Sequence, residues 1–329
     1  MIKKIIIKLC PHLVHFAGCF RAEVVRPFYA FPKEYRKGSL FKYVYNYIVY
    51  GCSVDEYNCL FFYERNAKSK KTFVTIRKNR KLDKMFNTEE ANKILWDKGL
   101  FNEYFKQFNH RQYLQISANT TDEQLLDFAN SNASGYLVKP DDLYYGKGIY
   151  KSNGLEELKK LRSSGRSYIV EEIVRNCPEL AVLNPTSLNT LRCVTCLDKN
   201  GDVHFITIAL RTGGKGAVVD NVLSGGTYYH VDIETGIIDR PGMDAFGNDN
   251  YLLHPASGVM MPGFKIPRFA EMKNFVIQLA KHLPDARYVG WDIAITPDSF
   301  EVIEGNVSPG ACSLQCDQEG ALEKFKKIS

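Results

Sequence analysis

The chain has 329 residues, of which 45% are hydrophobic and 24% charged, with a formal net charge of +6. This length suits one large domain or two to three subdomains, and the mildly basic balance suits nucleotides, phosphates or acidic sugars as well as nucleic acid. Nine scattered cysteines exclude a disulfide scaffold and show no zinc-type spacing, so we expect reduced thiols in a cytoplasmic protein.

The first segment, "MIKKIIIKLCPHLVHFAGCF", is apolar but interrupted. Lys8, Pro11, His12 and His15 break the run too early for a signal sequence or a transmembrane span. We predict a packed helix or strand here. A weak amphipathic contact with a membrane stays open as the alternative, since lysines flank the isoleucines.

Residues 1–115 are predicted to form a smaller, partly helical N-terminal region. The run "NTEEANKILWDKGLFNEYFKQF" has the 3.6-residue period of one or two helices. Asn87 or Thr88 is the expected cap of the first helix, with Glu90 in its first turn.

The rest of the chain predicts an α+β fold in two further parts. Residues 116–174 show the order strand, glycine loop, strand, helix, strand in "GYLVKP", "DDLYYGKGIYK", "GLEELKKLRSS" and "SYIVEEIV". Residues 175–329 contain antiparallel strands in "NTLRCVTCLD", "VHFITIALRTG" and "GGTYYHVDIETGII", followed by the helix "RFAEMKNFVIQLAKHL". The "CVTC" of the first of these strands indicates strand packing rather than a redox or metal pair.

Near the end of the chain, "GWDIAITPDSFEVIEGNVSPG" places two carboxylates and an amide in apolar strands. A turn over residues 296–300 would set Asp292 opposite Glu304, and alternation would put Ala294, Val302 and Asn306 on the same face. Buried carboxylates need a compensating cation or hydrogen bonds, and Mg²⁺ prefers such oxygen donors. The alternative is a polar hairpin edge whose carboxylates face water.

A second candidate site is "YLVKPDDLYYGKGIYK". Lys139 ends an apolar strand, and Gly146, Lys147 and Gly148 follow in a loop where backbone amides and a lysine could approach phosphate. The spacing is neither that of a Walker loop nor that of a dinucleotide site. An ordinary hairpin turn is the alternative.

A third candidate is "YIVEEIVRNCPEL". This strand ends in Glu171 and Glu172, and the loop after it carries Glu179. Backbone groups at such a strand edge could bind adenine, with a carboxylate near the ribose. A surface loop with ordinary acidic residues is the alternative.

Taken in order, these motifs resemble the ATP-grasp superfamily, most closely its sugar-transfer-associated branch from polysaccharide biosynthesis, over residues 98–310. The resemblance implies an ATP-grasp fold in which two α+β subdomains grip ATP. It implies that Lys98, or else the nearby Lys93, is the first ATP lysine and that Lys139 is the second. Implied contacts also include the loop Gly146, Lys147 and Gly148 over the triphosphate, Glu171, Glu172 and Ile173 at adenine, and Glu179 at ribose.

The resemblance further implies a magnesium set formed by Asp292, Glu304 and Asn306. It makes Arg192 the candidate for stabilising the transferred phosphate, with Arg211, Asp220 and Asn221 nearer the acceptor. Two features depart from the family pattern. The glycine loop is short and aromatic, with Tyr144 and Tyr145, and the N-terminal region lacks a glycine-rich Rossmann-like pattern.

The activity implied by the resemblance is an ATP- and Mg²⁺-dependent carboxylate–amine ligase. Its expected substrate is a small molecule or glycan precursor with a carboxylate, which an amine or similar nucleophile would attack after activation as an acyl phosphate. A kinase of a hydroxyl or amide acceptor is one alternative. A basic nucleic-acid-binding protein using the Tyr/Phe/Lys-rich first third is another, although no nucleic-acid partner is expected. The oligomeric state stays open.

Overall fold

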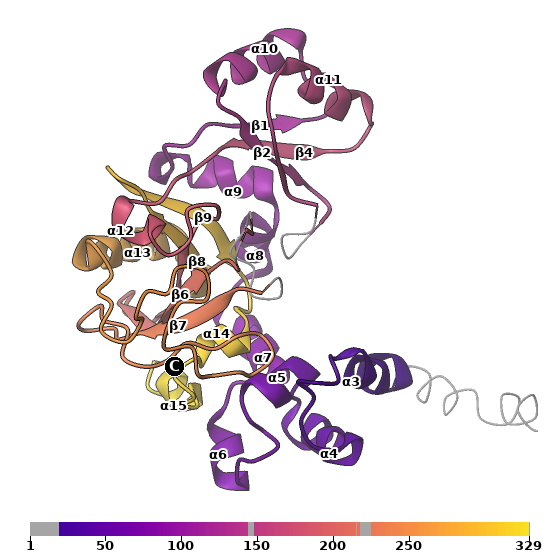
Figure 1. The fold of residues 1–329 in the computed structure, drawn as a ribbon, viewed down its shortest axis with the longest axis vertical. Helices are drawn as coiled ribbons and strands as arrows, with labels where there is room; N and C mark the ends of the chain where they lie inside the picture. Colours follow the sequence, from indigo (N-terminus) through magenta and orange to yellow (C-terminus); the bar gives the residue numbers. More distant parts are fainter. Residues whose placement is uncertain (1–19, 144–147, 215, 218–224, 329) are drawn as a thin grey trace, which may run out of the picture.

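Two antiparallel sheets form the framework of the molecule. The computed structural model describes residues 20–143, 148–214, 216–217 and 225–328, and Figure 1 shows one sheet above the other. The small sheet has the order β1-β4-β2-β3 and the large sheet the order β7-β6-β5-β8-β9. The α+β class is therefore confirmed. The strands are β1 Tyr113–Ile116, β2 Tyr136–Pro140, β3 Tyr150–Ser152, β4 Tyr168–Glu172, β5 Thr190–Leu197, β6 Val203–Thr212, β7 Thr227–Val231, β8 Tyr288–Ile295 and β9 Phe300–Asn306.

The small sheet is covered by two helices, α10 (Asp122–Ser131) and α11 (Leu155–Ser163). Thr121 and Gln124 form a capping box that starts α10, which fixes where the chain leaves β1. Leu125 and Leu158 bring the two helices onto a buried cluster with the strand residue Val170. Because this sheet begins at Tyr113, the predicted boundary between residues 115 and 116 falls inside β1.

One face of the large sheet packs against α13 (Phe269–His282). All eight residues of β5 and of β8 are buried, as expected for central strands covered on both faces. Leu191, Trp291 and Ile293 meet Met272 and Val276 of α13 in the largest apolar cluster. The "CVTC" segment lies within β5, and both of its cysteines are buried, which confirms the strand prediction.

The other face of the large sheet is partly covered by α7 (Ile76–Phe86), α14 (Ala311–Leu314) and α15 (Leu322–Lys326). Val194, Cys196 and Tyr288 pack there against Phe86 and Phe325. This apolar cover occupies one part of the face. The remaining part carries the charged residues described below.

The N-terminal region is helical, as predicted. Thr88 caps α8 by accepting a hydrogen bond from Ala91 N, and Asp97 caps α9, so the predicted helical run forms two helices. The remaining elements outside the sheets are η1 Arg21–Val25, α3 Arg26–Ala30, α4 Leu40–Tyr50, α5 Val54–Cys59, α6 Ala67–Thr72, α8 Glu89–Trp96, α9 Lys98–Tyr104, η2 Lys106–Phe108 and α12 Pro178–Ala181. In Figure 1, α9 lies between the two sheets and α8 lies beside the large sheet near β8, whereas α3, α4 and α6 lie at the far end from the small sheet.

The described part of the chain contains seven cysteines, and all are free thiols. Within the same residues, no helix combines the length and the apolar character needed to cross a bilayer.

The β8–β9 hairpin has the predicted pairing at its centre. Asp292 stands opposite Glu304, which confirms the expected register at this pair. Beyond it the register shifts, so that Ile293 pairs with Val302 and Ile303 is the extra residue. The prediction that Val302 shares the face of Asp292 is therefore wrong, because this bulge turns Val302 into the apolar core beside Ile293.

Candidate active site

A row of charged side chains crosses the large sheet on the face opposite α13. Arg192 of β5 pairs in register with Asp292 of β8, which in turn pairs with Glu304 of β9. Arg211 joins the row from β6, where it lies two residues from Ala209, the partner of Arg192. Because residues two apart on a strand share a face, the sheet register alone brings these four side chains together.

Asp292 is held by both arginines. Arg192 donates through Nε to Oδ1 and through Nη2 to Oδ2 at 2.9 Å, and Arg211 Nη1 lies 2.5 Å from Oδ2. Burial by itself would raise the pKa of Asp292, but the two guanidinium groups outweigh it and hold that pKa well below its usual range. Asp292 is therefore a stable carboxylate that keeps two cations on this face.

Glu304 is the accessible carboxylate of the pair, with 56% of its side chain exposed. Partial desolvation by the surrounding protein and the nearby Asp292 carboxylate raise the pKa of Glu304 to about 7. Arg192 Nη2 approaches it only to 3.9 Å. Two residues on, Asn306 donates through Nδ2 to Gly290 O at 3.2 Å, which fixes the orientation of its amide.

Gly305, which lies between Glu304 and Asn306, occupies a position with no room for a side chain. A Cβ at this position would lie 2.6 Å from Leu95 Cδ2 of α8 and 3.1 Å from Phe101 Cε2 of α9. The absence of a side chain lets both helices pack directly on β9. The position of the strand segment that carries Glu304 and Asn306 therefore depends on how the N-terminal region packs on the sheet.

The hairpin offers the oxygen donors that Mg²⁺ prefers. Two carboxylates that pair across the hairpin, Asp292 and Glu304, and the neighbouring amide of Asn306 are oxygen donors of this kind. Glu304 and Asn306 are the better placed donors, because both oxygens of Asp292 already accept hydrogen bonds from arginine. The described residues contain no group of three or more His, Cys, Asp or Glu side chains arranged for a metal.

A cavity of about 350 Å³ lies between the two sheets, a size typical of small-molecule sites. Lys139, Glu171, Glu172 and Ile173 line it, so the structure brings these four predicted residues together. Ile303 also lines it, which places the cavity beside the strand that carries Glu304. Further lining residues are Leu137, Lys151, Val174, Arg175, Asn176, Ala181, Asn184, Pro185, Thr186, Ser187 and Leu188.

One feature of the cavity wall points to a polar ligand, and a second shows that both sheet units contribute to the wall. The buried Ser187 hydroxyl has no hydrogen-bond partner among the described residues, an arrangement that a bound ligand would satisfy. Lys151 of β3 donates through Nζ to Thr186 O at 3.1 Å, which joins the small sheet to the segment after α12. The cavity therefore has one wall from each of the two sheet units.

Two of the charged residues that line the cavity, Lys139 and Glu171, form an ion pair with Nζ–Oε2 at 2.5 Å. Glu171 also accepts from Arg111 Nε at 3.3 Å and from Asn102 Nδ2 at 3.3 Å. Burial alone would raise the pKa of Glu171, yet Lys139 and Arg111 lower it to about 2. Glu171 is thus a buried structural carboxylate that positions Lys139 at the cavity.

Arg111 extends this network to the hairpin. Its Nη1 donates to Val302 O at 2.8 Å and to Glu301 Oε2 at 3.2 Å. His110 N donates to the other oxygen of Glu301 at 2.7 Å. Arg111 therefore ties β4 of the small sheet to β9 of the large sheet.

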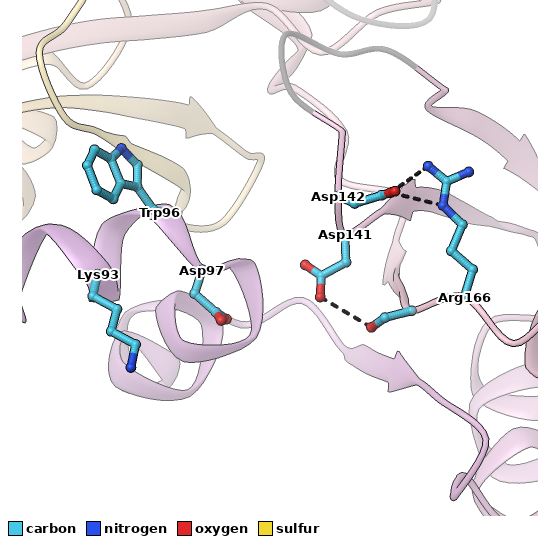
Figure 2. Close-up of a pocket in the computed structure, with 7 residues that line it drawn as sticks. Lys93, Trp96, Asp97, Asp141, Asp142 and Arg166 are labelled. Atoms are coloured by element: carbon cyan, nitrogen blue, oxygen red, sulfur yellow. Dashed lines mark hydrogen bonds and ion pairs between the residues drawn. The ribbon is translucent and has the colours of Figure 1, made fainter.

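Lys98, the predicted first ATP lysine, holds the start of the glycine loop. Its Nζ donates to Asp141 O at 2.9 Å and to Leu143 O at 3.2 Å, carbonyls that come just before the loop. Lys93 lines a second cavity of about 360 Å³, and Asp141 also lines that cavity. Figure 2 shows Lys93 and Trp96 on one side of that cavity and Asp141, Asp142 and Arg166 on the other.

The remaining predicted residues are placed as follows. Glu172 N donates to Gln112 O at 2.9 Å, so an adenine edge would have to use the backbone beyond Glu172. Glu179 is exposed in the first turn of α12 and is not one of the residues that line the cavity. Gly148 has a φ of +73°, a conformation that favours glycine. Gly146, Lys147, Tyr144, Tyr145, Asp220 and Asn221 lie outside the described residues.

The sequence reasoning missed Arg111, Asn102, Glu301, Lys151 and Ser187. Lys151 stands only three residues after the glycine loop, so its position could have suggested a role. The other four come from segments that meet only in the folded chain, and no local spacing signals their contacts.

The molecule is thus an α+β chain with two antiparallel sheets, a cavity between them and an acidic hairpin beside that cavity. The model of the sugar-transfer associated ATP-grasp family matches residues 77–329, and the chain belongs to this family. The family suspected from the motifs, and with it the ATP-grasp fold, is confirmed. No match was found among curated proteins.

Solved ATP-grasp structures resemble the chain at low identity. The D-alanine–D-alanine ligase of Helicobacter pylori is 17% identical with a TM-score of 0.47, over 74% of this chain and 64% of that one. An N5-carboxyaminoimidazole ribonucleotide synthetase in its ADP complex is 11% identical with a TM-score of 0.48, over 78% and 58%. The ATP-grasp ligase PsnB, solved with a precursor variant, Mg and ADP, is 14% identical with a TM-score of 0.45, over 74% and 60%. The alignments span less than two thirds of each of these three solved chains.

Proposed function

We propose that this chain is an ATP-dependent ligase that activates a carboxylate as an acyl phosphate for attack by an amine or similar nucleophile. The substrate class is a small molecule or glycan precursor with a carboxylate. One observation carries the proposal. The cavity lined by Lys139 and Glu172 is also lined by Ile303, the residue before Glu304, and Glu304 stands opposite Asp292, which both Arg192 and Arg211 contact.

The cavity is assigned to the nucleotide. Leu137 and Ile173 offer apolar surface for a base, and the backbone beyond Glu172 offers hydrogen-bonding groups. Lys139 supplies positive charge for phosphate, and Glu171 holds its amino group in place. In this assignment the triphosphate extends past Ile303 toward Glu304.

The hairpin is assigned to magnesium, with Glu304 and Asn306 as the principal ligands and Asp292 as the third donor. Bound there, the ion would supply charge neutralisation for the β- and γ-phosphates. The chain's own cations, Arg192 and Arg211, would stabilise negative charge that develops on the transferred group. Both are anchored before any substrate arrives, since Asp292 holds them.

The reaction itself needs position more than covalent catalysis. A carboxylate oxygen of the substrate attacks the γ-phosphorus, the bond to the ADP oxygen breaks, and an acyl phosphate forms. The amine nitrogen then attacks the acyl carbon, inorganic phosphate leaves, and the amine loses a proton. Arg192 and Arg211 lie on the face where this phosphate would pass.

The test is a trapping experiment with the full chain. Uronic acids and nucleotide sugars are screened with magnesium-ATP for ADP release, first with amino acids as nucleophiles and then with hydroxylamine. A ligase gives ADP together with a hydroxamate of the acid. A stable phosphorylated product without hydroxamate would instead identify a kinase of a hydroxyl or amide acceptor and overturn the ligase proposal.

A matched pair of variants ties the activity to the hairpin. Glu304→Gln removes the proposed ligand, and Glu323→Gln makes the same change at a carboxylate of α15 with a similar exposure of 58%. Only Glu304→Gln should abolish hydroxamate formation. Equal activity of both variants would contradict the assignment of the site.

A further inference from the structure

Helix α4 exposes an apolar stripe along its length. Phe41, Tyr45, Ile48 and Val49 recur at the spacing of one helix face, and all four are exposed. Phe41 is 86% exposed and Ile48 57%. An exposed apolar stripe of this length, on a helix whose other face is already buried, indicates a site of interaction with a partner.

The buried face shows that the orientation of α4 is fixed by the fold. Tyr43, Asn46 and Tyr50 point inward, and the ring of Tyr43 stacks on Phe28 with centroids 5.4 Å apart. Ser39 caps the first turn, and Gly51 ends the helix in a left-handed conformation. The stripe is therefore a property of the folded chain rather than of a loose helix.

The stripe lies far from the candidate active site. Figure 1 shows α3 and α4 at the end of the molecule opposite the small sheet, beyond the large sheet. Tyr29 of α3 is a further exposed aromatic residue in this region. A surface that contacts this end would leave the cavity between the two sheets accessible.

Positive charge borders the stripe at both ends. Lys42 is exposed in the first turn of α4. At the other end, the Arg77 guanidinium donates to Tyr47 O and Ile48 O, both at 2.9 Å. In residues 20–50, Glu23 and Glu34 are outnumbered by the basic residues Arg21, Arg26, Lys33, Arg36, Lys37 and Lys42.

We infer that α4 docks this stripe onto an anionic lipid surface, lying in the plane of the membrane interface. Helices with aromatic and aliphatic residues on one face and basic residues at the borders of that face are typical of segments that bind anionic membrane surfaces. A second copy of the chain is a less suitable partner for the stripe. Antiparallel pairing of two α4 helices would bring Lys42 of one copy near Arg77 of the other, where like charges repel.

The experiment is vesicle co-sedimentation of the full chain. Phosphatidylglycerol vesicles supply the anionic surface and phosphatidylcholine vesicles the neutral one. The wild-type chain should bind the anionic vesicles and lose that binding as salt is raised, because exposed charges are screened. Equal binding to both vesicle types would overturn the role of charge.

Two double variants test the stripe itself. Phe41→Ser with Ile48→Ser should weaken partition onto anionic vesicles at least about tenfold, since that partition scales with buried apolar area. Met85→Ser with Leu126→Ser removes two exposed apolar side chains from α7 and α10 and should bind like wild type. Far-ultraviolet circular dichroism and the melting temperature should match among the three proteins, because every substituted side chain is exposed.

Two outcomes would reject the inference. If Phe41→Ser with Ile48→Ser binds vesicles like wild type, the stripe does not carry the binding. The binding would then come from another part of the chain, such as residues 1–19, which both variants keep unchanged. If wild type binds no vesicles but is a dimer by light scattering, and this variant is a monomer, the stripe is instead an interface between two copies.

Discussion

Arg111 binds Glu171 of the small sheet and Glu301 of the large sheet at the same time, with Nε–Oε2 and Nη1–Oε2 distances of 3.3 and 3.2 Å. Its side chain is 2% exposed. The Arg111 guanidinium is therefore the buried link between the unit that holds Lys139 and the hairpin that holds Glu304. A substitution of Arg111 should therefore alter both the cavity that contains Lys139 and the hairpin that contains Glu304.

Arg111→Ala should destabilise the chain by about 3–5 kcal/mol, because two buried carboxylates lose their shared counterion. Urea unfolding followed by circular dichroism measures the change. Lys106→Ala provides the control, since it breaks an exposed ion pair with Glu103 and should leave the unfolding midpoint nearly unchanged. A similar midpoint for both variants would show that the Arg111 network does not stabilise the folded chain.

Glu171 should make the chain sensitive to acid. Its pKa is lowered to about 2, so its ion pairs stabilise the folded state above the ordinary carboxyl pKa and lose that effect as the pH falls toward 2. The loss is on the order of 3 kcal/mol for this group. Urea midpoints at about pH 5 and about pH 3 should differ less for Glu171→Gln than for wild type, because the amide does not titrate. Equal differences would assign the acid sensitivity to other groups.

Lys98 and Lys93 should behave differently toward ATP. Lys98→Ala removes the amino group that holds the carbonyls of Asp141 and Leu143, and we expect about tenfold weaker ATP binding through the loosened loop start. Lys93→Ala changes the second cavity and should bind ATP like wild type. Calorimetric titration of both variants checks this, and the reverse order of effects would make Lys93 the ATP lysine.

Gly305→Ala should disturb the hairpin without removing any polar group. The added Cβ would meet Leu95 and Phe101 at 2.6 and 3.1 Å, an overpacking that costs about 1–3 kcal/mol. Because α8 and α9 would shift against β9, we also expect weaker magnesium-ATP binding. Gly310→Ala is the control for the loss of a glycine, since a Cβ there would meet Ser313 Oγ at an ordinary 3.7 Å and the φ of −53° suits alanine. If only stability falls in Gly305→Ala, the packing of α8 and α9 does not position Glu304.

The sequence was sufficient for the elements that local patterns encode. Periodicity, turns and capping residues predicted a cap at Asn87 or Thr88, which is Thr88 in the structure. They also predicted the order of β2, β3, α11 and β4 and the pairing of Asp292 with Glu304. The bulge at Ile303 did not follow, because a one-residue shift in register depends on how Val302 packs against the rest of the core.

The candidate site was predictable only in part, because some of its contacts also depend on tertiary packing. Lys139 and Glu172 lie on strands and Ile173 directly follows one, in motifs that are local, and the fold brings all three to one cavity. Arg111 and Glu301 are separated by 190 residues and meet only through the approach of the two sheets. The contacts of Lys98 with backbone carbonyls are likewise tertiary, and the family resemblance that suggested a phosphate contact for Lys98 could not reveal them.

The pairing of Glu304 with Asn306 as magnesium ligands is the central claim, and ATP binding with and without Mg²⁺ tests it most directly. Isothermal titration of the full chain needs no knowledge of the acceptor. We expect Mg²⁺ to strengthen ATP binding about tenfold or more in wild type and in Glu323→Gln, but not in Glu304→Gln with Asn306→Ala. An unchanged effect of Mg²⁺ in that double variant would contradict the account.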